Sequence, residues 1–148
     1  PLLQQDEVPR SGSTGSREAV QELPSYRILA VDDNRAAVHL LSRLLQSLKQ
    51  DVHTAADGEA ALVEIREFEP DVVISDIAMP GMTGYELAHR IREQPNGRSI
   101  VLVALTGYGQ ESDRQAAAAA GFDRHLTKPV SMDQLTDLLC SLESRPPG

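Results

Sequence analysis

The sequence predicts an α/β fold in which a doubly wound parallel sheet of five strands carries helices on both faces. Short apolar segments alternate five times with segments whose apolar residues recur at helical spacing. Several of these apolar segments are nearly continuous, as expected for strands that are buried on both faces. Since each parallel crossover needs a helix, the alternation predicts an open sheet whose ligand crevice lies beyond the carboxyl ends of the strands.

The first half of the chain supplies two pairs of a strand and a helix. Residues 26–31 form a short apolar strand, and residues 34–48 place apolar side chains at helical spacing after Asn34, a suitable N-cap. Residues 51–56 predict a second strand. Residues 57–68 predict a second helix, which opens with an aspartate that can cap it.

Two further pairs follow in the second half. Residues 71–75 are an apolar strand, and residues 84–94 form a helix that ends before a Pro-Asn-Gly sequence. Residues 100–105 are a continuous apolar strand. Residues 110–121 then predict an alanine-rich helix that ends at a glycine.

The last pair completes the domain. Residues 124–127 form a short strand, and residues 131–144 form an amphipathic helix that opens with a capping serine. Residues 1–24 contain a Ser/Gly/Thr cluster and no sustained periodicity, which indicates a flexible linker. We therefore expect one folded domain over residues 25–144, with residues 145–148 as a C-terminal tail.

Composition argues against several classes of partner. The 148 residues carry 14 Lys and Arg against 22 Asp and Glu, a formal charge of −8, without any basic run, which disfavours direct binding to nucleic acid or an anionic membrane. The single cysteine, Cys140, forms no intramolecular disulfide and favours an intracellular, cytoplasmic chain. No apolar segment approaches the roughly 20 residues that span a bilayer. The first residue, Pro1, suggests a fragment of a longer protein.

Polar residues follow four of the five predicted strands. Asp32 and Asp33 follow the first strand, and Asp76 follows the third. Thr106 follows the fourth strand and Lys128 the fifth. Because the carboxyl ends of parallel strands meet at one edge of the sheet, we expect all five residues to lie at one rim.

Three carboxylates at this rim would repel one another. Without compensation at least one of them would keep its proton, with a pKa above the usual value of about 4. Since the candidate ligands are all oxygens, the cation that relieves this repulsion should be hard and divalent, and Mg²⁺ fits best. Acids, a divalent cation, a hydroxyl and an ammonium are the groups that phosphoryl transfer uses, with Asp76 as the nucleophile.

Each of these residues also has a purely structural interpretation. Asp32 or Asp33 alone could cap the first helix. Thr106 could be an ordinary residue at the end of a strand, and Lys128 before Pro129 could be a solvated residue in a turn. The occurrence of all of them at successive strand ends favours a functional site.

Four sequence motifs resemble the receiver domain of two-component response regulators, over residues 26–143. They are ILAVDDN with Asp32 and Asp33, VVISDIAMPGMTGYEL with Asp76, VALTGYGQ with Thr106, and GFDRHLTKPV with Lys128. The resemblance implies a flavodoxin-like strand order of 2-1-3-4-5. Periodicity alone predicts only the fold class.

The resemblance also implies roles for these residues. Asp76 would be the phosphoacceptor, Lys128 would neutralise the transferring group, and Thr106 would bind a phosphoryl oxygen and start the conformational switch. The implied Mg²⁺ ligands are Asp33 directly, Asp32 through water, Asp76, and the backbone carbonyl of Ala78. The donor would be a phosphohistidine on a histidine kinase or a histidine phosphotransfer domain. Such a domain catalyses its own phosphorylation and dephosphorylation and is not a turnover enzyme.

The sequence departs from the family pattern at a few positions. His125 stands where the family usually has the aromatic switch residue, and it is either a switch residue that can titrate or a half-exposed residue without a signalling role. Thr83 replaces the usual acid or Asn, and it can cap the helix that follows. Tyr108 is expected to shield the site. The Lys128-Pro129 bond resembles a joint that is cis in the family.

The sequence of the last two motifs is most similar to receivers of hybrid sensor histidine kinases, so the parent chain could be a histidine kinase. A receiver from a transcriptional or single-domain response regulator is the alternative. Two other classes stay open: a haloacid-dehalogenase-like phosphatase, against which Ala78 argues because that family has a second acid there, and a binding module that is never phosphorylated. A homodimer that forms on phosphorylation also stays open.

Overall fold

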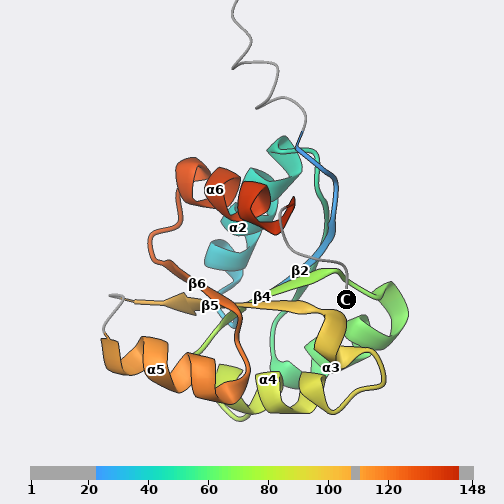
Figure 1. The fold of residues 1–148 in the computed structure, drawn as a ribbon, viewed down its shortest axis with the longest axis vertical. Coiled ribbons are helices and arrows are strands. Elements are labelled where there is room, and N and C mark those ends of the chain that lie inside the picture. Colours follow the sequence, from blue (N-terminus) through green and yellow to red (C-terminus); the bar gives the residue numbers. More distant parts are fainter. Residues whose placement is uncertain (1–22, 108–110, 144–148) are drawn as a thin grey trace, which may run out of the picture.

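A parallel sheet lies at the centre of the part of the chain that the computed structural model describes, residues 23–107 and 111–143 (Figure 1). It has five strands in the order β3-β2-β4-β5-β6, which is the predicted order 2-1-3-4-5 counted along the chain. All neighbouring strands pair in parallel. The strands are β2 (Arg27–Val31), β3 (Asp51–Ala55), β4 (Val72–Asp76), β5 (Val101–Thr106) and β6 (Arg124–Thr127).

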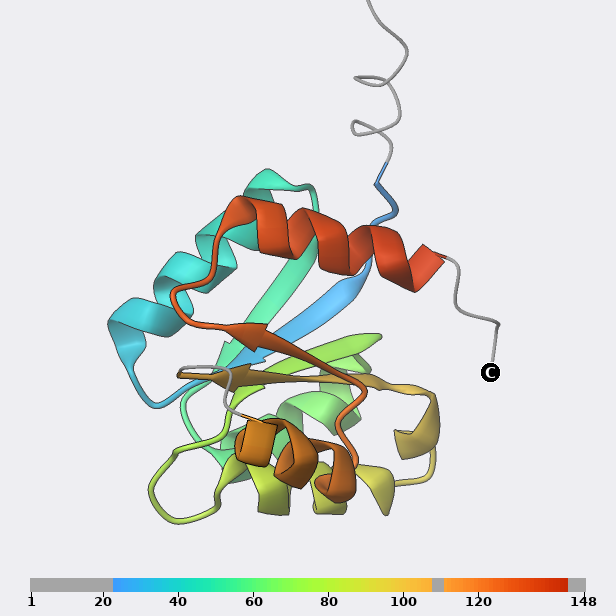
Figure 2. The same cartoon turned by 60° about the vertical axis from the view of Figure 1, so that its left-hand side comes forward.

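Helices cover the sheet on both faces. The helices are α2 (Arg35–Ser47), α3 (Gly58–Phe68), α4 (Gly84–Arg92), α5 (Glu111–Ala120) and α6 (Met132–Glu143). Helices α2 and α6 lie on one face, and α3, α4 and α5 lie on the other (Figures 1 and 2). The predicted fold class is therefore confirmed.

Alternation along the central strands divides the apolar residues between two cores. In β2, Ile28 and Ala30 face α2 and α6, whereas Leu29 and Val31 face the other three helices. All four side chains are fully buried, as strands covered on both faces require. Burial of each large aliphatic side chain contributes about 1.5–3 kcal/mol, so the two cores together hold the sheet between its helices.

Local capping starts the helices where the sequence predicts. The side chains of Asn34 and Asp57 accept hydrogen bonds from backbone N–H groups in the first turns of α2 and α3. Thr83 forms a capping box with Glu86 at the start of α4, so the unusual residue at position 83 does cap this helix. Ser131 accepts a hydrogen bond from the amide of Gln134 before α6.

Several boundaries differ from the predicted ones by one or two residues. Asp76 and Thr106 are the last residues of their strands, one position beyond the predicted ends. Helix α4 ends at Arg92, and the unpredicted 3₁₀ turn Gly97–Ser99 follows it. The predicted tail, most of the predicted linker, and Tyr108 lie outside the described residues.

The chain already contacts the domain before β2 begins. Leu23, which falls within the predicted linker, packs against the core under α2 and α6. The buried side chain of Gln50 accepts a hydrogen bond from the amide of Tyr26 and donates one to the carbonyl of Pro24. These bonds fix residues 23–26 against the turn between α2 and β3.

Among the described helices, none combines the length and the apolar character that crossing a lipid bilayer requires.

Candidate functional site

Strand register brings three carboxylates together at the carboxyl end of the sheet. Val31 of β2 pairs with Ser75 of β4, so the next residues, Asp32 and Asp76, lie side by side. Asp33 follows directly. One carboxylate oxygen from each of Asp32, Asp33 and Asp76 lies within 4.8 Å of the other two. The sheet thus positions these acids through backbone pairing.

Lys128 reaches the same acids from the other side of the rim. Its Nζ lies 3.3 Å from Oδ1 of Asp76 and 3.6 Å from Oδ2 of Asp32. Its backbone amide donates to the carbonyl of Thr106 at 2.8 Å, which ties the residue to the end of β5. The peptide bond between Lys128 and Pro129 is cis, as predicted. The ammonium therefore lies directly beside the predicted phosphoacceptor.

Two of the three acids are removed from solvent. Asp32 is 2% exposed and Asp76 is 8% exposed, whereas Asp33 is exposed. Burial raises the pKa of Asp32, and the charge of Asp76 raises it further, while the backbone amide of Asn34 and the charge of Lys128 oppose the rise. The sequence predicted a raised pKa from repulsion among the acids, but the larger cause is loss of hydration.

These donors fit a hard divalent cation. Such ions prefer carboxylate and carbonyl oxygens, and three carboxylate oxygens converge here, with one ammonium beside them among the described residues. A buried carboxylate that carries a charge needs such compensation. The side chains present therefore match the cation that the sequence predicts.

Thr106 ends the strand next to Asp76, and Ala78 follows Asp76 by two residues. Thr106 is 3% exposed, and its hydroxyl donates to the carbonyl of Leu126 in β6 at 3.4 Å. The amide of Ala78 donates to Oδ1 of Asp76 at 3.4 Å. At the next residue, Gly107, an added Cβ atom would meet no other atom within 4 Å.

The end of β4 is also held by the first residue of α4. A Cβ atom at Gly84 would lie 2.5 Å from the carbonyl oxygen of Asp76, and the amide of Gly84 donates to the carbonyl of Ile77 at 2.9 Å. Only glycine permits this close approach. The helix start thereby fixes the backbone that carries Asp76.

His125 lies within β6 and not at the rim. It is half-buried and pairs with Ala104, which belongs to the core under α3, α4 and α5. Its side chain is therefore on that face of the sheet, on an edge strand. A role in switching stays a prediction.

A cavity of about 520 Å³ opens beside the acids, between α2 and the segment after β6. Asp32, Lys128 and Gly107 form its polar end. Most of the remaining lining is apolar: Ala37, Leu40, Leu41, Leu44, Leu105, Pro129 and Val130. Leu40 is 58% exposed and was not singled out from the sequence, because it lies outside the apolar spacing of its helix. The sequence feature that could have identified it is the presence of a leucine on the solvent-facing side of an amphipathic helix.

The family model of the response regulator receiver domain matches residues 28–140, more than half of the chain. This chain belongs to the response regulator receiver family. The receiver domain is therefore a component of two-component signalling. The strand order that the sequence resemblance implied is the one observed, and the three acids of its motifs lie together.

Two curated relatives differ greatly in length. The receiver domain is 40% identical over 120 residues to an uncharacterized 14.6 kDa protein of Leptolyngbya boryana, a match that covers 81% of this chain and 92% of that protein. It is 43% identical over 120 residues to the virulence sensor protein BvgS of Bordetella pertussis, a match that covers 78% of this chain and 10% of that protein. Similar domains thus occur in small proteins and in large sensor proteins.

Two solved structures share the fold. The receiver domain of the Pseudomonas aeruginosa sensor histidine kinase PA1611, which has magnesium coordinated in its active site cleft, is 30% identical with a TM-score of 0.73 and covers 80% of this chain and 97% of that chain. The receiver domain of Saccharomyces cerevisiae Ssk1, solved with the histidine phosphotransfer protein Ypd1, is 25% identical with a TM-score of 0.73 and covers 79% of this chain and 88% of that chain.

Proposed function

We propose that this receiver domain takes a phosphoryl group from a phosphohistidine onto Asp76 and changes conformation in response. The observation that carries the proposal is the position of the Asp76 carboxylate, which lies 3.3 Å from the ammonium of Lys128 and within 4.8 Å of two further acids. A buried carboxylate with a cation beside it can attack phosphorus while the charge that develops is balanced.

Three acids and one backbone carbonyl would hold Mg²⁺. We assign Asp33 as a direct ligand, Asp32 as a ligand through water, and Asp76 and the carbonyl of Ala78 as further ligands. A bound magnesium ion would neutralise charge on the phosphoryl oxygens. Asp32 suits a role through water because its carboxylate also accepts the amide of Asn34 at 3.0 Å and is only partly available.

In the transfer, an oxygen of Asp76 forms a bond to phosphorus as the bond from phosphorus to the donor's imidazole nitrogen breaks. The nitrogen keeps the electron pair of that bond, and the product is an acyl phosphate on Asp76. Lys128, whose ammonium lies 3.3 Å from Oδ1 of Asp76, would neutralise negative charge on the phosphoryl group that arrives there. Its position, fixed through its backbone bond to Thr106, therefore matters as much as its charge.

Thr106 would couple the chemistry to the fold. In the structure its hydroxyl donates to the carbonyl of Leu126. A phosphoryl oxygen on Asp76 is a stronger, charged acceptor, so the hydroxyl would turn toward it and release that carbonyl. Leu126 follows His125 in β6, so the exchange would change the environment of the proposed switch residue.

The cavity beside Asp76 would receive the donor protein. The cavity is lined by Asp32, Lys128 and apolar side chains of α2. A protein whose histidine comes close enough to react would therefore cover this surface. The exposed residues Arg35, His39 and Arg43 give α2 a basic surface without any acid, although the chain is acidic overall. The docking partner should therefore present an apolar patch surrounded by acids.

Mass spectrometry after incubation with acetyl phosphate and Mg²⁺ tests the proposed chemistry. We expect one added phosphoryl group on the wild-type chain, and none when Asp76→Asn is treated or when the metal is chelated. Addition of the same mass to Asp76→Asn would refute the assignment of the acceptor. Absence of any addition to the wild type would favour a module that is not phosphorylated.

A phosphatase of the haloacid-dehalogenase type is the weaker alternative. Its turnover needs a second acid two positions after the nucleophile, and that position is Ala78 here, with only its backbone near Asp76. A general phosphate ester offered as substrate should consequently not be turned over.

We further propose a context for the domain. The similarity to BvgS and to the PA1611 receiver supports a place in a hybrid sensor histidine kinase, with a separate response regulator as the alternative. The donor would be a histidine kinase or a phosphotransfer protein, as the Ypd1 complex of Ssk1 suggests. The proposal places the domain, residues 25–144, in the cytoplasm, where kinases find their nucleotide, and includes dimerisation on phosphorylation as a consequence to be tested.

A further inference from the structure

The side chain of Arg92, at the end of α4, joins three segments at the end of the sheet opposite to the acids. Its guanidinium donates to the carbonyls of Gly97 at 2.8 Å and Ile100 at 2.7 Å, which lead into β5. It donates twice to the carbonyl of Gly121, at 3.1 and 2.6 Å, in the turn between α5 and β6. It also forms an ion pair with Asp123 at 2.8 Å. The guanidinium is largely withdrawn from solvent, with 18% of the side chain exposed.

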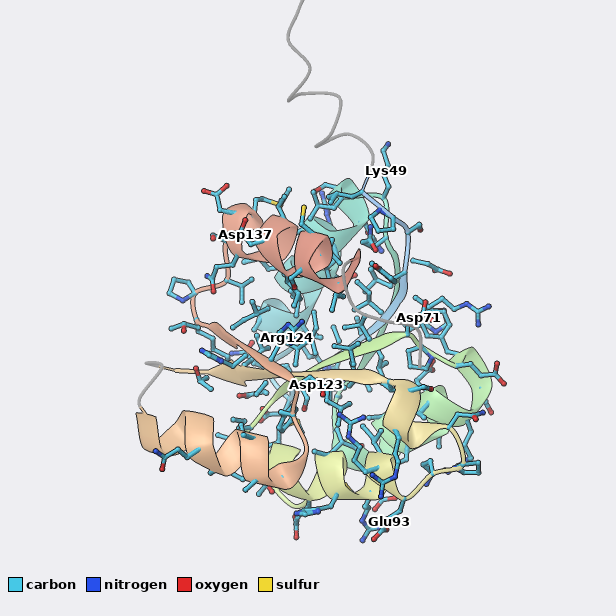
Figure 3. All side chains as sticks on the ribbon, in the orientation of Figure 1. Lys49, Asp71, Glu93, Asp123, Arg124 and Asp137 are labelled. Carbon is cyan, nitrogen blue, oxygen red and sulfur yellow. The ribbon has the colours of Figure 1, made fainter. Side chains whose placement is uncertain are left out.

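Asp123 connects this cluster to the edge of the sheet. Its Oδ2 accepts the backbone amide of Leu102 at 3.0 Å, and its own amide donates to the carbonyl of Leu102 at 2.7 Å. Asp123 therefore brackets one residue of β5 from both sides. The label in Figure 3 marks its position where the chain enters β6 beside β5. The next residue, Arg124, pairs with Val103 and starts the ladder.

Strand β6 has few features of its own that define its register. It is a four-residue edge strand in which Leu126 is the only buried residue. Register is weakly specified where a strand buries little on either face, and a slip by one residue would exchange the faces of all its side chains. The two hydrogen bonds between Asp123 and Leu102, together with the ion pair between Asp123 and Arg92, therefore set the register of β6.

The register of β6 determines the position of Lys128. With Arg124 opposite Val103, Thr127 pairs with Thr106, and the amide of Lys128 meets the carbonyl of Thr106 at 2.8 Å. In this arrangement the ammonium lies 3.3 Å from Asp76. We infer that Arg92 and Asp123 are positioning residues of the phosphorylation site, which act on Lys128 through the register of β6 from about 17 Å away, given the rise of roughly 3.3 Å per strand residue.

The inference rests on the proposed function, and it adds that the position of Lys128 and the binding of Mg²⁺ depend on different strands. The acids that would hold Mg²⁺ lie after β2 and at the end of β4, and neither strand pairs with β6. Loss of the bracket should therefore impair the group that β6 carries and spare the metal site. A variant that simply unfolds the chain would impair both.

The experiment compares Asp123→Ala with Asp123→Asn in the full chain. Asparagine keeps an oxygen that can accept the amide of Leu102, whereas alanine does not. We expect Asp123→Ala to be phosphorylated by acetyl phosphate roughly tenfold to a hundredfold more slowly, the loss typical of a misplaced catalytic group. We expect an unchanged Mg²⁺ dissociation constant by calorimetry, and recovery of most of the rate in Asp123→Asn.

Arg92→Ala should have the same effect as Asp123→Ala, and Arg90→Ala is its matched control. Arg90 lies on the same helix with its side chain exposed, so its removal should change neither measurement. An unchanged rate in a folded Asp123→Ala would overturn the inference. Parallel losses of rate and Mg²⁺ affinity, without rescue by asparagine, would also overturn it, because they would indicate a structural role only.

Hydrogen exchange of the Lys128 amide tests the register without phosphorylation. This amide is protected by its bond to Thr106, and it should exchange faster in Asp123→Ala while the amides of β2 stay protected. If the wild type is never phosphorylated, the proposed function fails, but this measurement still decides the inference. Equal protection of the Lys128 amide in the wild type and in Asp123→Ala would refute it.

Discussion

Asp32 carries an ionisable carboxyl group at a buried position, and burial disfavours the charged form of that group. It is 2% exposed, it lies beside Asp76, and its pKa is raised mainly by burial. The folded protein therefore binds a proton to Asp32 at pH values where the unfolded chain does not. Stability falls as the pH rises from the ordinary value of 3.8 through the raised value, and the cost is complete above it.

Asp32→Asn should consequently stabilise the metal-free protein. The gain should be present at neutral pH, should shrink as the pH falls through the raised pKa, and should vanish below 3.8, where Asp32 is protonated in both states. Urea unfolding with a chelator present, at several pH values, measures it. Asp51→Asn, at an exposed position on β3, is the control. A loss of stability at neutral pH would contradict the assigned cause.

Thr106→Ala should separate phosphorylation from its structural effect. The hydroxyl is not the nucleophile, so the variant should still gain a phosphoryl group on Asp76. Without the hydroxyl that now bonds to Leu126, phosphorylation should change hydrogen exchange in α5, β6 and α6 much less than in the wild type. Loss of this buried bond should also cost about 1 kcal/mol of unfolding free energy.

Thr106→Ser, which keeps the hydroxyl, is the control for this prediction. It should restore the change in exchange at α5, β6 and α6. An undiminished response in Thr106→Ala would show that the signal passes through another residue.

Sequence position predicted which residues lie at the rim, because the end of a parallel strand determines the location of the residue that follows. Asp32, Asp76 and Lys128 were found in this way. Arg92 and Asp123 were not, because their contacts join segments 31 positions apart and depend on how the turns fold. An arginine at the end of a helix is common for its favourable interaction with the helix dipole, and this alone did not distinguish Arg92.

Among the secondary-structure elements, helix α2 combines two roles. One side packs into the core through Leu41 and Leu45, and the outer side presents Leu40 to the cavity next to Asp76. An exposed leucine contributes little to folding and is available to a partner. The element therefore packs against the sheet with one side and would form the proposed donor surface with the other.

Leu40→Asp should weaken transfer from a phosphohistidine donor and leave transfer from acetyl phosphate unchanged. A charge at the apolar surface opposes docking of a protein, whereas a small donor does not need that surface. Because the side chain is 58% exposed, the unfolding free energy should change by no more than about 0.5 kcal/mol. Parallel time courses with purified kinase domain and with acetyl phosphate measure the difference.

Val63→Asp is the matched control for Leu40→Asp. Val63 is 41% exposed on α3, which covers the opposite face of the sheet, so its substitution should affect neither donor. Equal rates for wild type and Leu40→Asp with the protein donor would show that the donor docks elsewhere.

The elements themselves followed from the sequence more fully than their boundaries did. Apolar runs, helical spacing and capping residues predicted the five strands and five helices, and burial on both faces gives strands β2, β4 and β5 a continuous apolar signal. The 3₁₀ turn Gly97–Ser99 was missed, since three residues carry no periodicity. The half-exposed edge strand β6 was found mainly from the residues around it.

For the whole molecule, folding is what gathers the three carboxylates. In the unfolded chain Asp76 is far from the neighbouring pair Asp32 and Asp33, so a divalent ion should bind the folded state and stabilise it by mass action. At a Mg²⁺ concentration a hundred times the dissociation constant, the unfolding free energy should rise by about 2.7 kcal/mol. Thermal unfolding with and without Mg²⁺ measures the effect.

Asp33→Asn should remove most of this stabilisation, because it removes a proposed direct ligand of the ion. Since Asp33 is exposed, its substitution should change the stability of the metal-free protein little. Na⁺ at the same ionic strength controls for general screening. A melting temperature that does not respond to Mg²⁺ would refute a divalent ion at this rim.

The pairing of β2 with β4 has a consequence for how the chain folds. Asp71, which precedes β4 and is labelled in Figure 3, accepts the amide of Arg27 across 44 positions of sequence, and the bond between β5 and β6 at Thr106 spans 20. Pairings of such high contact order carry a larger entropic cost of loop closure and form slowly. Asp32 and Asp76 meet only when that long-range pairing is complete, so a newly made or partly folded chain has no acceptor site to modify. If the domain is phosphorylated as proposed, the modification should therefore be confined to chains in which β2 and β4 have paired.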